Sequence, residues 1–219
     1  MLGDKLIIKE EHIKAAKELL KLLLPKIKAA EKNDKAFIIT IAGESGAGKS
    51  ETAVALSQQL VETGIKSHIL QQDDYFFYPP KTNDMMRRKD INHVGTSEVN
   101  LDLLDQNLRD IQERKEKIEK PLVAYEQDEA VREILNLRGI PVIIVEGTYT
   151  TLLKNAHQRV FIDRIYLETK SERLERGREE QDEYLEKVLE IEHSIISKHK
   201  AKADIIVTRD FDVIQNESK

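Results

Sequence analysis

The segment from Gly43 to Ser50, GESGAGKS, brings three glycines, two serines and a lysine into eight consecutive positions. Glycines leave backbone N–H groups accessible to a bulky anion and tolerate the conformations of a tight loop. The segment matches G-x-x-x-x-G-K-[ST], which binds nucleotide phosphates between a strand and a helix. We expect Lys49 to reach the β and γ phosphates and the Ser50 hydroxyl to ligate Mg²⁺. The expected nucleotide-binding residues are Gly43, Glu44, Ser45, Gly46, Ala47, Gly48, Lys49, Ser50 and Glu51.

Acidic residues follow two apolar runs that resemble buried strands. Asp73 and Asp74 come after one run in LQQDDYF, and Glu146 ends the other in IIVEGTY. Because parallel strands end at one edge of a sheet, where ligands of such folds bind, these carboxylates are expected to meet there. We expect Asp73 to accept a proton from a substrate hydroxyl, with Asp74 as its alternative, and Glu146 to serve the metal. Capping of a turn is the structural alternative for the aspartates.

Arginines gather in SERLERGREE, a segment expected to be helical and to lie over the site. Arg173, Arg176 and Arg178 would offset charge on the transferring phosphoryl group and exclude water from it. A regular helix cannot place Arg176 and Arg178 on one face, so Gly177 is expected to mark a break. The alternative is a surface cluster in which the arginines pair with Glu175, Glu179 and Glu180.

Strands and helices alternate around these motifs. Residues 36–42, AFIITIA, form an apolar run typical of a central strand covered on both faces. A helix over 51–63 and a short strand over 67–70 complete a βαβ unit. Further strands are expected at 141–147, 164–168 and 204–208, which together predict an α/β fold with a mainly parallel central sheet.

The remaining segments are less regular. Residues 75–100 contain Pro79 and Pro80 and are expected to be irregular, and a helix should follow over 101–118. Two extended stretches, 121–125 and 131–137, can form a hairpin that projects Tyr125 and Glu126 toward an acceptor pocket, although Tyr125 fits a core position equally well. A long charged helical region is expected over 171–200.

An amphipathic helix is expected over residues 10–31, with an apolar stripe and with Pro25 breaking or kinking it. Packing on its own domain is favoured over binding a membrane surface or a partner. We divide the chain into an N-terminal helical extension, 1–35, and one domain that carries the glycine-rich loop, 36–219. The stripe includes Ile13, Leu20, Leu24 and Ile27.

Composition excludes several classes of protein. The 219 residues carry a formal net charge of -5 and no cysteine, so disulfides, thiolate zinc sites and cysteine nucleophiles are ruled out. No basic patch indicates nucleic acid, and the Leu-rich stretch 19–24 is too short to span a membrane. We expect a cytoplasmic protein that binds neither nucleic acid nor membrane, and the sequence leaves open whether it forms a homo-oligomer.

Taken together, the motifs resemble those of the uridine kinase and phosphoribulokinase family of P-loop kinases. The likeness spans residues 36–210 and includes GESGAGKS, QQDDYF, EVNLDLL, PLVAYE, VEG and ERGRE in that order. It implies a three-layer P-loop fold with a helical lid, Asp73 as the base, and Arg173 and Arg176 in the lid. It also implies that Ser50, Asp73 and Glu146 surround Mg²⁺. The residues expected to face the substrate are Asp74, Tyr75, Tyr125, Glu126 and Arg178.

Two departures concern the substrate. Where uridine kinases carry an acid that contacts the ribose, this chain has Val94 and Gly95, and Ala130 stands near the place of a base-contacting histidine. We therefore expect an ATP- and Mg²⁺-dependent kinase that phosphorylates a hydroxyl of a small molecule, most simply a nucleoside such as uridine. The alternatives are a kinase of a non-nucleoside alcohol, such as pantothenate, glycerate or a sugar phosphate, and a nucleotide-binding regulatory module without phosphotransfer.

Overall fold

The centre of the fold is a six-stranded sheet, seen in a computed structural model that describes residues 6–177 and 182–217. The strand order is β2-β5-β1-β6-β7-β8; the pairs from β2 to β7 are parallel and β8 is antiparallel. The expected α/β fold with a mainly parallel sheet is confirmed. The strands are β1 (Phe37–Gly43), β2 (Ser67–Gln71), β5 (Val142–Glu146), β6 (Gln158–Ile162), β7 (Ile205–Val207) and β8 (Val213–Gln215).

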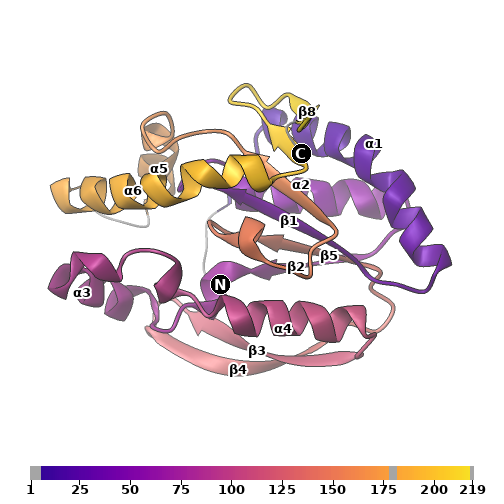
Figure 1. Ribbon diagram of the computed structural model, residues 1–219, viewed down its shortest axis with the longest axis horizontal. Coiled ribbons are helices and arrows are strands. Elements are labelled where there is room, and N and C mark those ends of the chain that lie inside the picture. The colour runs from indigo at the N-terminus through magenta and orange to yellow at the C-terminus, as the bar shows by residue number, and fades with distance from the viewer. Residues whose placement is uncertain (1–5, 178–181, 218–219) are drawn as a thin grey trace.

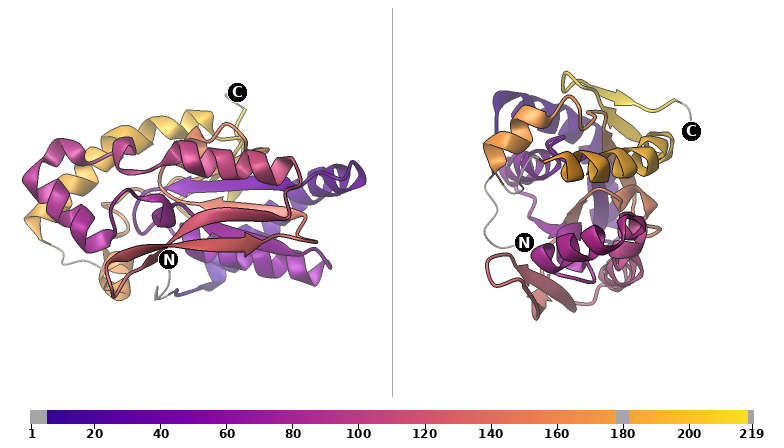
Figure 2. Two further views of the ribbon diagram at one scale, coloured as in Figure 1. Left: turned by 90° about the horizontal axis from the view of Figure 1, so that it is seen from below. Right: turned by 90° about the vertical axis from the view of Figure 1, so that its left-hand side faces the viewer.

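Strand β1 is buried along its whole length because helices cover both faces of the sheet. Ile39 and Ile41 belong to one hydrophobic core, whereas Ile38 and Ala42 belong to the other. Helices α1 (Glu10–Lys32) and α2 (Lys49–Glu62) enclose the first core. Helices α4 (Leu101–Gln112) and α6 (Glu183–Ile196) lie on the opposite side of the sheet (Figure 2), which completes three layers.

Helix α1 runs unbroken through Pro25, so the expected break there is wrong. Its buried face includes Ala15, Leu19, Leu23 and Ile27, which pack in the same core as α2 and β1 (Figure 1). The extension therefore covers the domain's own core, while its boundary at residue 35 stays a prediction. No helix in the described ranges is both long enough and apolar enough to cross a membrane.

The segment 75–100 is more regular than expected, because it contains α3 (Pro80–Lys89). Pro80 occupies the first turn, where a missing N–H costs nothing, and so it starts a helix instead of excluding one. The N-terminus of α3 is held by Asp128, whose carboxylate accepts hydrogen bonds from the N–H groups of Lys81 at 2.7 Å and Thr82 at 3.1 Å. Asp128 lies in the turn of a hairpin far along the chain.

That hairpin is formed by β3 (Lys117–Ala124) and β4 (Glu129–Asn136), which among the described residues pair only with each other. It confirms the expected hairpin but begins earlier, and α4 therefore ends at Gln112 instead of reaching residue 118. In Figure 1 the hairpin lies below α4, apart from the main sheet.

The expected strand over 164–168 is wrong, since the strand beside β1 is β6, six residues upstream. The segment 164–168 is instead a turn that leads into α5 (Lys170–Arg176). Helix α5 ends at Arg176, and its C-cap Gly177, with a φ of +66°, confirms the break expected there. The helical region 171–200 is thus divided between α5, α6 and a short 3₁₀ segment.

Candidate active site

The glycine-rich loop connects β1 to α2, as the sequence predicts. Gly46 and Gly48 adopt φ values of +75° and +95°, which side chains of other residues rarely allow. A Cβ built on Gly48 would lie 2.8 Å from Nε2 of His12, and one on Gly46 would lie 3.0 Å from Cγ of Arg173. Both glycines are therefore required by conformation and by space, and the loop is packed between α1 and α5.

The start of α2 is suited to an anion. Gly48 is its N-cap, and no side chain in the described part of the chain caps the helix, so its first N–H groups and its dipole can serve a phosphate. Lys49 lies over the loop, where its Nζ donates a hydrogen bond to the carbonyl oxygen of Glu44 at 2.9 Å. The backbone and Lys49 thus surround the space that the motif reserves for phosphates.

Glu44 fixes the loop to the opposite wall of the site. Its side chain is buried, and one carboxylate oxygen accepts a hydrogen bond from the N–H of Tyr166 at 2.7 Å. The other carboxylate oxygen lies 2.7 Å from Nδ1 of His193 in α6. A third tie comes from Thr169, whose hydroxyl donates to the carbonyl oxygen of Ser45 at 2.8 Å. The loop is therefore held by α6 and by the segment before α5, which its local sequence could not indicate.

The sheet brings the predicted acidic residues to the same edge. In the strand register, Glu146 is paired with Ile41 of β1 and with Gln71 of β2. Glu146 is buried, and Asp73 lies two residues beyond Gln71 in a half-buried position of a short 3₁₀ turn. Glu146 and Asp73 thus stand at the ends of adjacent strands, next to the strand that carries the loop.

Gly147 permits this approach of β5 to β2. It has a φ of +154°, and a Cβ there would lie 2.2 Å from the Cβ of Gln72. The Gln72 side chain in turn accepts a hydrogen bond from the N–H of Tyr149 at 2.7 Å. The two strand ends are therefore locked together directly beside Asp73.

Asp74 and Tyr75 face the protein interior, and their expected role toward the substrate stays a prediction. Asp74 is 2% exposed and accepts hydrogen bonds from Nζ of Lys120 at 2.8 Å and from the N–H of Val123 at 3.0 Å. The Tyr75 hydroxyl donates to Asn107 of α4 at 2.8 Å, and burial raises its pKa. These side chains fix the turn to the hairpin and to α4, because a tight turn points successive side chains in different directions.

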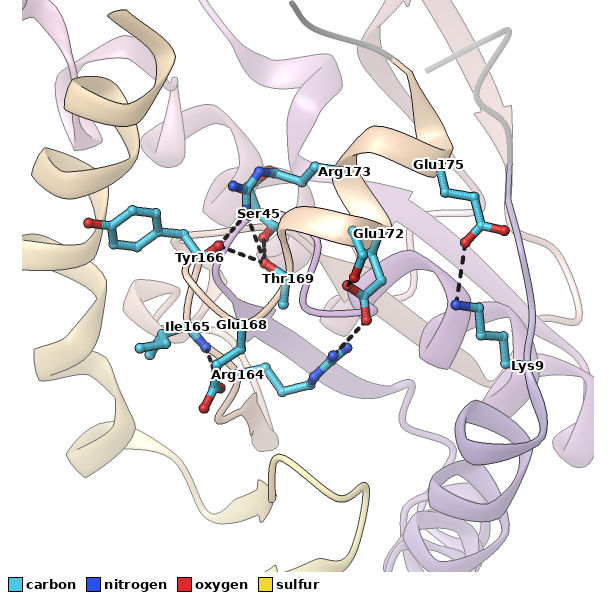
Figure 3. A network of polar contacts seen from close by, with 11 residues as sticks. Lys9, Ser45, Arg164, Ile165, Tyr166, Glu168, Thr169, Glu172, Arg173 and Glu175 are labelled. Carbon is cyan, nitrogen blue, oxygen red and sulfur yellow. Dashed lines mark hydrogen bonds and ion pairs between the residues drawn. The ribbon is translucent and has the colours of Figure 1, made fainter. Parts of the chain in front are cut away.

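Arg173 is placed over the loop but is not open to solvent. It is 2% exposed, and its guanidinium donates to the carbonyl oxygen of Tyr166 at 2.5 Å and to the hydroxyl of Thr169 at 3.0 Å (Figure 3). In this arrangement it ties α5 to the segment before it, and its role toward phosphate stays a prediction. Arg176 is the last residue of α5, and Arg178 lies outside the described residues.

Arg164 was missed by sequence reasoning because it lies in the segment that resembled a strand. Its guanidinium donates to the Glu172 carboxylate at 2.7 Å in the first turn of α5. Burial alone would raise the pKa of Glu172, but the hydrogen bonds from Arg164 and Ser171 outweigh it and hold that pKa at about 2. Glu172 is therefore ionised at neutral pH and holds the Arg164 guanidinium beside the loop.

Helix α3 contacts the turn of the hairpin. Tyr125 is half-buried and Glu126 exposed in the hairpin turn, where the Glu126 carbonyl oxygen accepts a hydrogen bond from Nζ of Lys81 at 3.0 Å. Glu98, another residue without a local sequence signal, is fully buried and accepts hydrogen bonds from Arg87 and Asn83, each at 2.5 Å. These contacts fix the position of α3 beside the site.

The residues present fit a magnesium ion that arrives with a nucleotide. Within residues 6–177 and 182–217, no three His, Cys, Asp or Glu side chains form a group able to hold a metal alone. The predicted set of Ser50, Asp73 and Glu146 offers one hydroxyl and two carboxylates. Mg²⁺ prefers such oxygen donors and commonly completes its coordination with phosphate oxygens and water.

A glycine-rich loop between the central strand and the next helix of a three-layer, mainly parallel sheet defines a P-loop α/β protein. The family model described as "Phosphoribulokinase / Uridine kinase family" matches residues 38–212, and the chain belongs to this family of kinases.

Two sequence relatives and one solved structure are similar to this chain. The chain is 30% identical over 187 residues to a uridine kinase of Leuconostoc citreum, with 79% of this chain and 87% of the relative covered. It is 28% identical over 192 residues to a bifunctional alpha-galactosidase/sucrose kinase of Mediterraneibacter gnavus, covering 81% of this chain but 20% of that longer protein. The structure of D-glycerate 3-kinase from Cryptococcus neoformans var. grubii has a similar fold, with a TM-score of 0.61, 12% identity, and coverage of 93% and 99%.

Proposed function

We propose that this protein is an ATP- and Mg²⁺-dependent kinase that transfers the γ-phosphate to a hydroxyl group of a small molecule. The observation that carries the proposal is the meeting of three features at one edge of the sheet. The phosphate loop follows β1, Glu146 ends β5, and Asp73 follows β2, with β5 paired to both β1 and β2. Kinases of this type rely on positioning and charge stabilisation at such an edge.

The residues take distinct roles in this proposal. The loop N–H groups and the start of α2 bind the phosphates, and Lys49 contacts the β and γ oxygens. Asp73 accepts the proton from the attacking hydroxyl. A bound Mg²⁺, held by Ser50, Asp73 and Glu146, would offset charge on the β and γ phosphates. The tie from Arg173 to Thr169 keeps α5 against the loop while the site closes.

For the acceptor, uridine is the first compound to test, because relatives about 30% identical to this chain carry the name uridine kinase. The positions that depart from uridine kinases provide no acid toward a ribose. Val94 is buried, Gly95 lies against Ile195, and Ala130 is exposed on β4. We therefore propose weak selectivity for uridine over deoxyuridine, since strong rejection requires buried groups that pair with the hydroxyl. A non-nucleoside alcohol is the second candidate.

The test is release of ADP from ATP with single acceptors. These are uridine, cytidine, deoxyuridine, pantothenate, glycerate, ribulose 5-phosphate and sucrose. Release that depends on one acceptor and disappears in the Lys49→Ala variant supports the kinase. ATP binding without acceptor-dependent release would favour a regulatory module instead. Uridine turnover that drops sharply with deoxyuridine would contradict the proposed weak selectivity.

A further inference from the structure

A cleft lies beside the phosphate loop, on the side away from Asp73 and Glu146. It is formed where the start of α1, the loop and the region around α5 meet. Its position follows from the strand order, because Asp73 and Glu146 follow β2 and β5, whereas Arg164 follows β6 on the other side of β1. The residues that matter here are Lys9, His12, Gly48, Glu51, Arg164 and Glu172.

His12 points a hydrogen-bond donor into this region. It is 5% exposed in the first turn of α1, and its Nδ1 accepts a hydrogen bond from the N–H of Lys9 at 3.0 Å. Burial lowers the pKa of His12, although Glu51 and Glu11 act to raise it, so the ring is neutral and carries its proton on Nε2. The structure gives Nε2 no hydrogen-bond partner among the described residues. Nε2 lines the cleft, so its N–H can donate to an oxygen atom of a ligand bound beside the loop.

The geometry also decides which part of a nucleotide would lie there. Nε2 of His12 is beside Gly48, at the junction of the loop and α2. The γ-phosphate must face Asp73, which lies on the side of β1 occupied by β5 and β2. The nucleoside at the other end of the nucleotide must therefore extend toward β6 and β7. On that side the His12 ring packs edge-on against Phe211 with centroids 5.0 Å apart, and the Arg164 guanidinium stands 5.2 Å from the centre of the Phe211 ring. Phe211 is itself buried, so its ring holds the His12 imidazole and the Arg164 guanidinium in place beside the cleft.

We propose that residues 6–12 form the outer wall of the donor-nucleotide site, with Nε2–H of His12 donating to an oxygen of the α-phosphate or ribose. This inference rests on the proposed use of ATP. The wall precedes the family match, which begins at residue 38, and so belongs to the extension of this chain. An ion pair of 3.4 Å between Lys9 and Glu175 connects the wall to α5 (Figure 3), so both elements enclose the nucleotide together.

The experiment measures the Kd of Mg·ADP by calorimetry with the full chain. His12→Leu should weaken binding about fivefold to tenfold, the loss of one hydrogen bond. His12→Gln, which keeps an N–H donor near the same place, should recover at least half of that loss. Leu20→Ala is the matched control, because Leu20 packs α1 on the core without reaching the loop. It should leave the Kd within about twofold, and thermal melting verifies that each variant is folded.

Binding of inorganic tripolyphosphate distinguishes the two sources of the oxygen. Weaker binding of both ADP and tripolyphosphate to His12→Leu assigns the contact to a phosphate, whereas weaker binding of ADP alone assigns it to the ribose. An unchanged Kd for ADP in His12→Leu, or an equal loss in Leu20→Ala, overturns this inference and leaves the kinase proposal intact. Failure of the unaltered protein to bind ADP overturns both.

Discussion

Replacing Gly147 by alanine is expected to destabilise the protein and to displace the catalytic edge. The φ of +154° is a conformation that costs an L-residue about 1–3 kcal/mol. The new Cβ would lie 2.2 Å from the Cβ of Gln72, so a strand end must shift, and overpacking of this kind costs about 1–3 kcal/mol. The sum is about 4 kcal/mol. Because Gln72 precedes Asp73, kcat should fall in the variant that remains folded.

Urea unfolding with a matched variant separates these two contributions. Gly139 has a φ of +72° with no atom within 4 Å of a built Cβ, so Gly139→Ala measures backbone strain alone, about 1 kcal/mol. The double variant Gly147→Ala, Gln72→Gly lacks the clashing Cβ of Gln72. Gly147→Ala should therefore lower the unfolding free energy less in the Gln72→Gly background than in the unaltered protein. If Gly147→Ala costs no more than Gly139→Ala, the close approach of β5 and β2 is not what requires glycine.

Four further predictions concern single side chains. Lys49→Ala should abolish phosphoryl transfer with an unchanged circular dichroism spectrum, and normal turnover would contradict the assigned phosphate loop. Asp73→Asn should lower kcat more than it raises the KM for ATP, and the reverse pattern would remove Asp73 as the base. Arg173→Ala should lower the melting temperature and should also lower kcat about tenfold. A lower melting temperature with an unchanged kcat would show that Arg173 has a structural role only. Burial lowers the pKa of His199 from 6.5 to about 4 in the folded protein. As the pH falls, His199 therefore binds a proton in the unfolded chain before it does so in the folded protein. This lowers the unfolding free energy between these values by up to about 1.4 kcal/mol per pH unit, and His199→Gln should flatten that slope in urea titrations.

The parts of the fold that the sequence predicts well are those specified locally. Strand β1 and helix α2 follow from an apolar run, a glycine-rich loop and a helical period, and Glu146 follows from the end of another apolar run. The structure confirms each of these placements because no distant residue has to decide them.

What could not be predicted depends on contacts distant in the chain. Helix α3 is stabilised at its start by Asp128, which is 46 positions from Thr82, so two prolines and polar residues alone suggested a loop. Glu44 is held by His193, 149 positions away, and neither residue has a neighbour that indicates the contact. Residues 158–162 and 164–168 both have strand-forming composition, and only the parallel register with β1 selects the first.

The strand order also has a consequence for the newly made chain. Within the part of the chain that the structure describes, β1 pairs with β5 and β6, so Ile41 must wait for Glu146 to leave the ribosome before its first β-partner exists. At translation rates of roughly 5–20 residues per second, this interval is on the order of ten seconds. During that time a mostly apolar strand has only α1 and α2, which are already synthesised, to pack on one of its faces. Docking of the N-terminal helix on that face would bury apolar surface of the nascent chain before β5 and β6 are made.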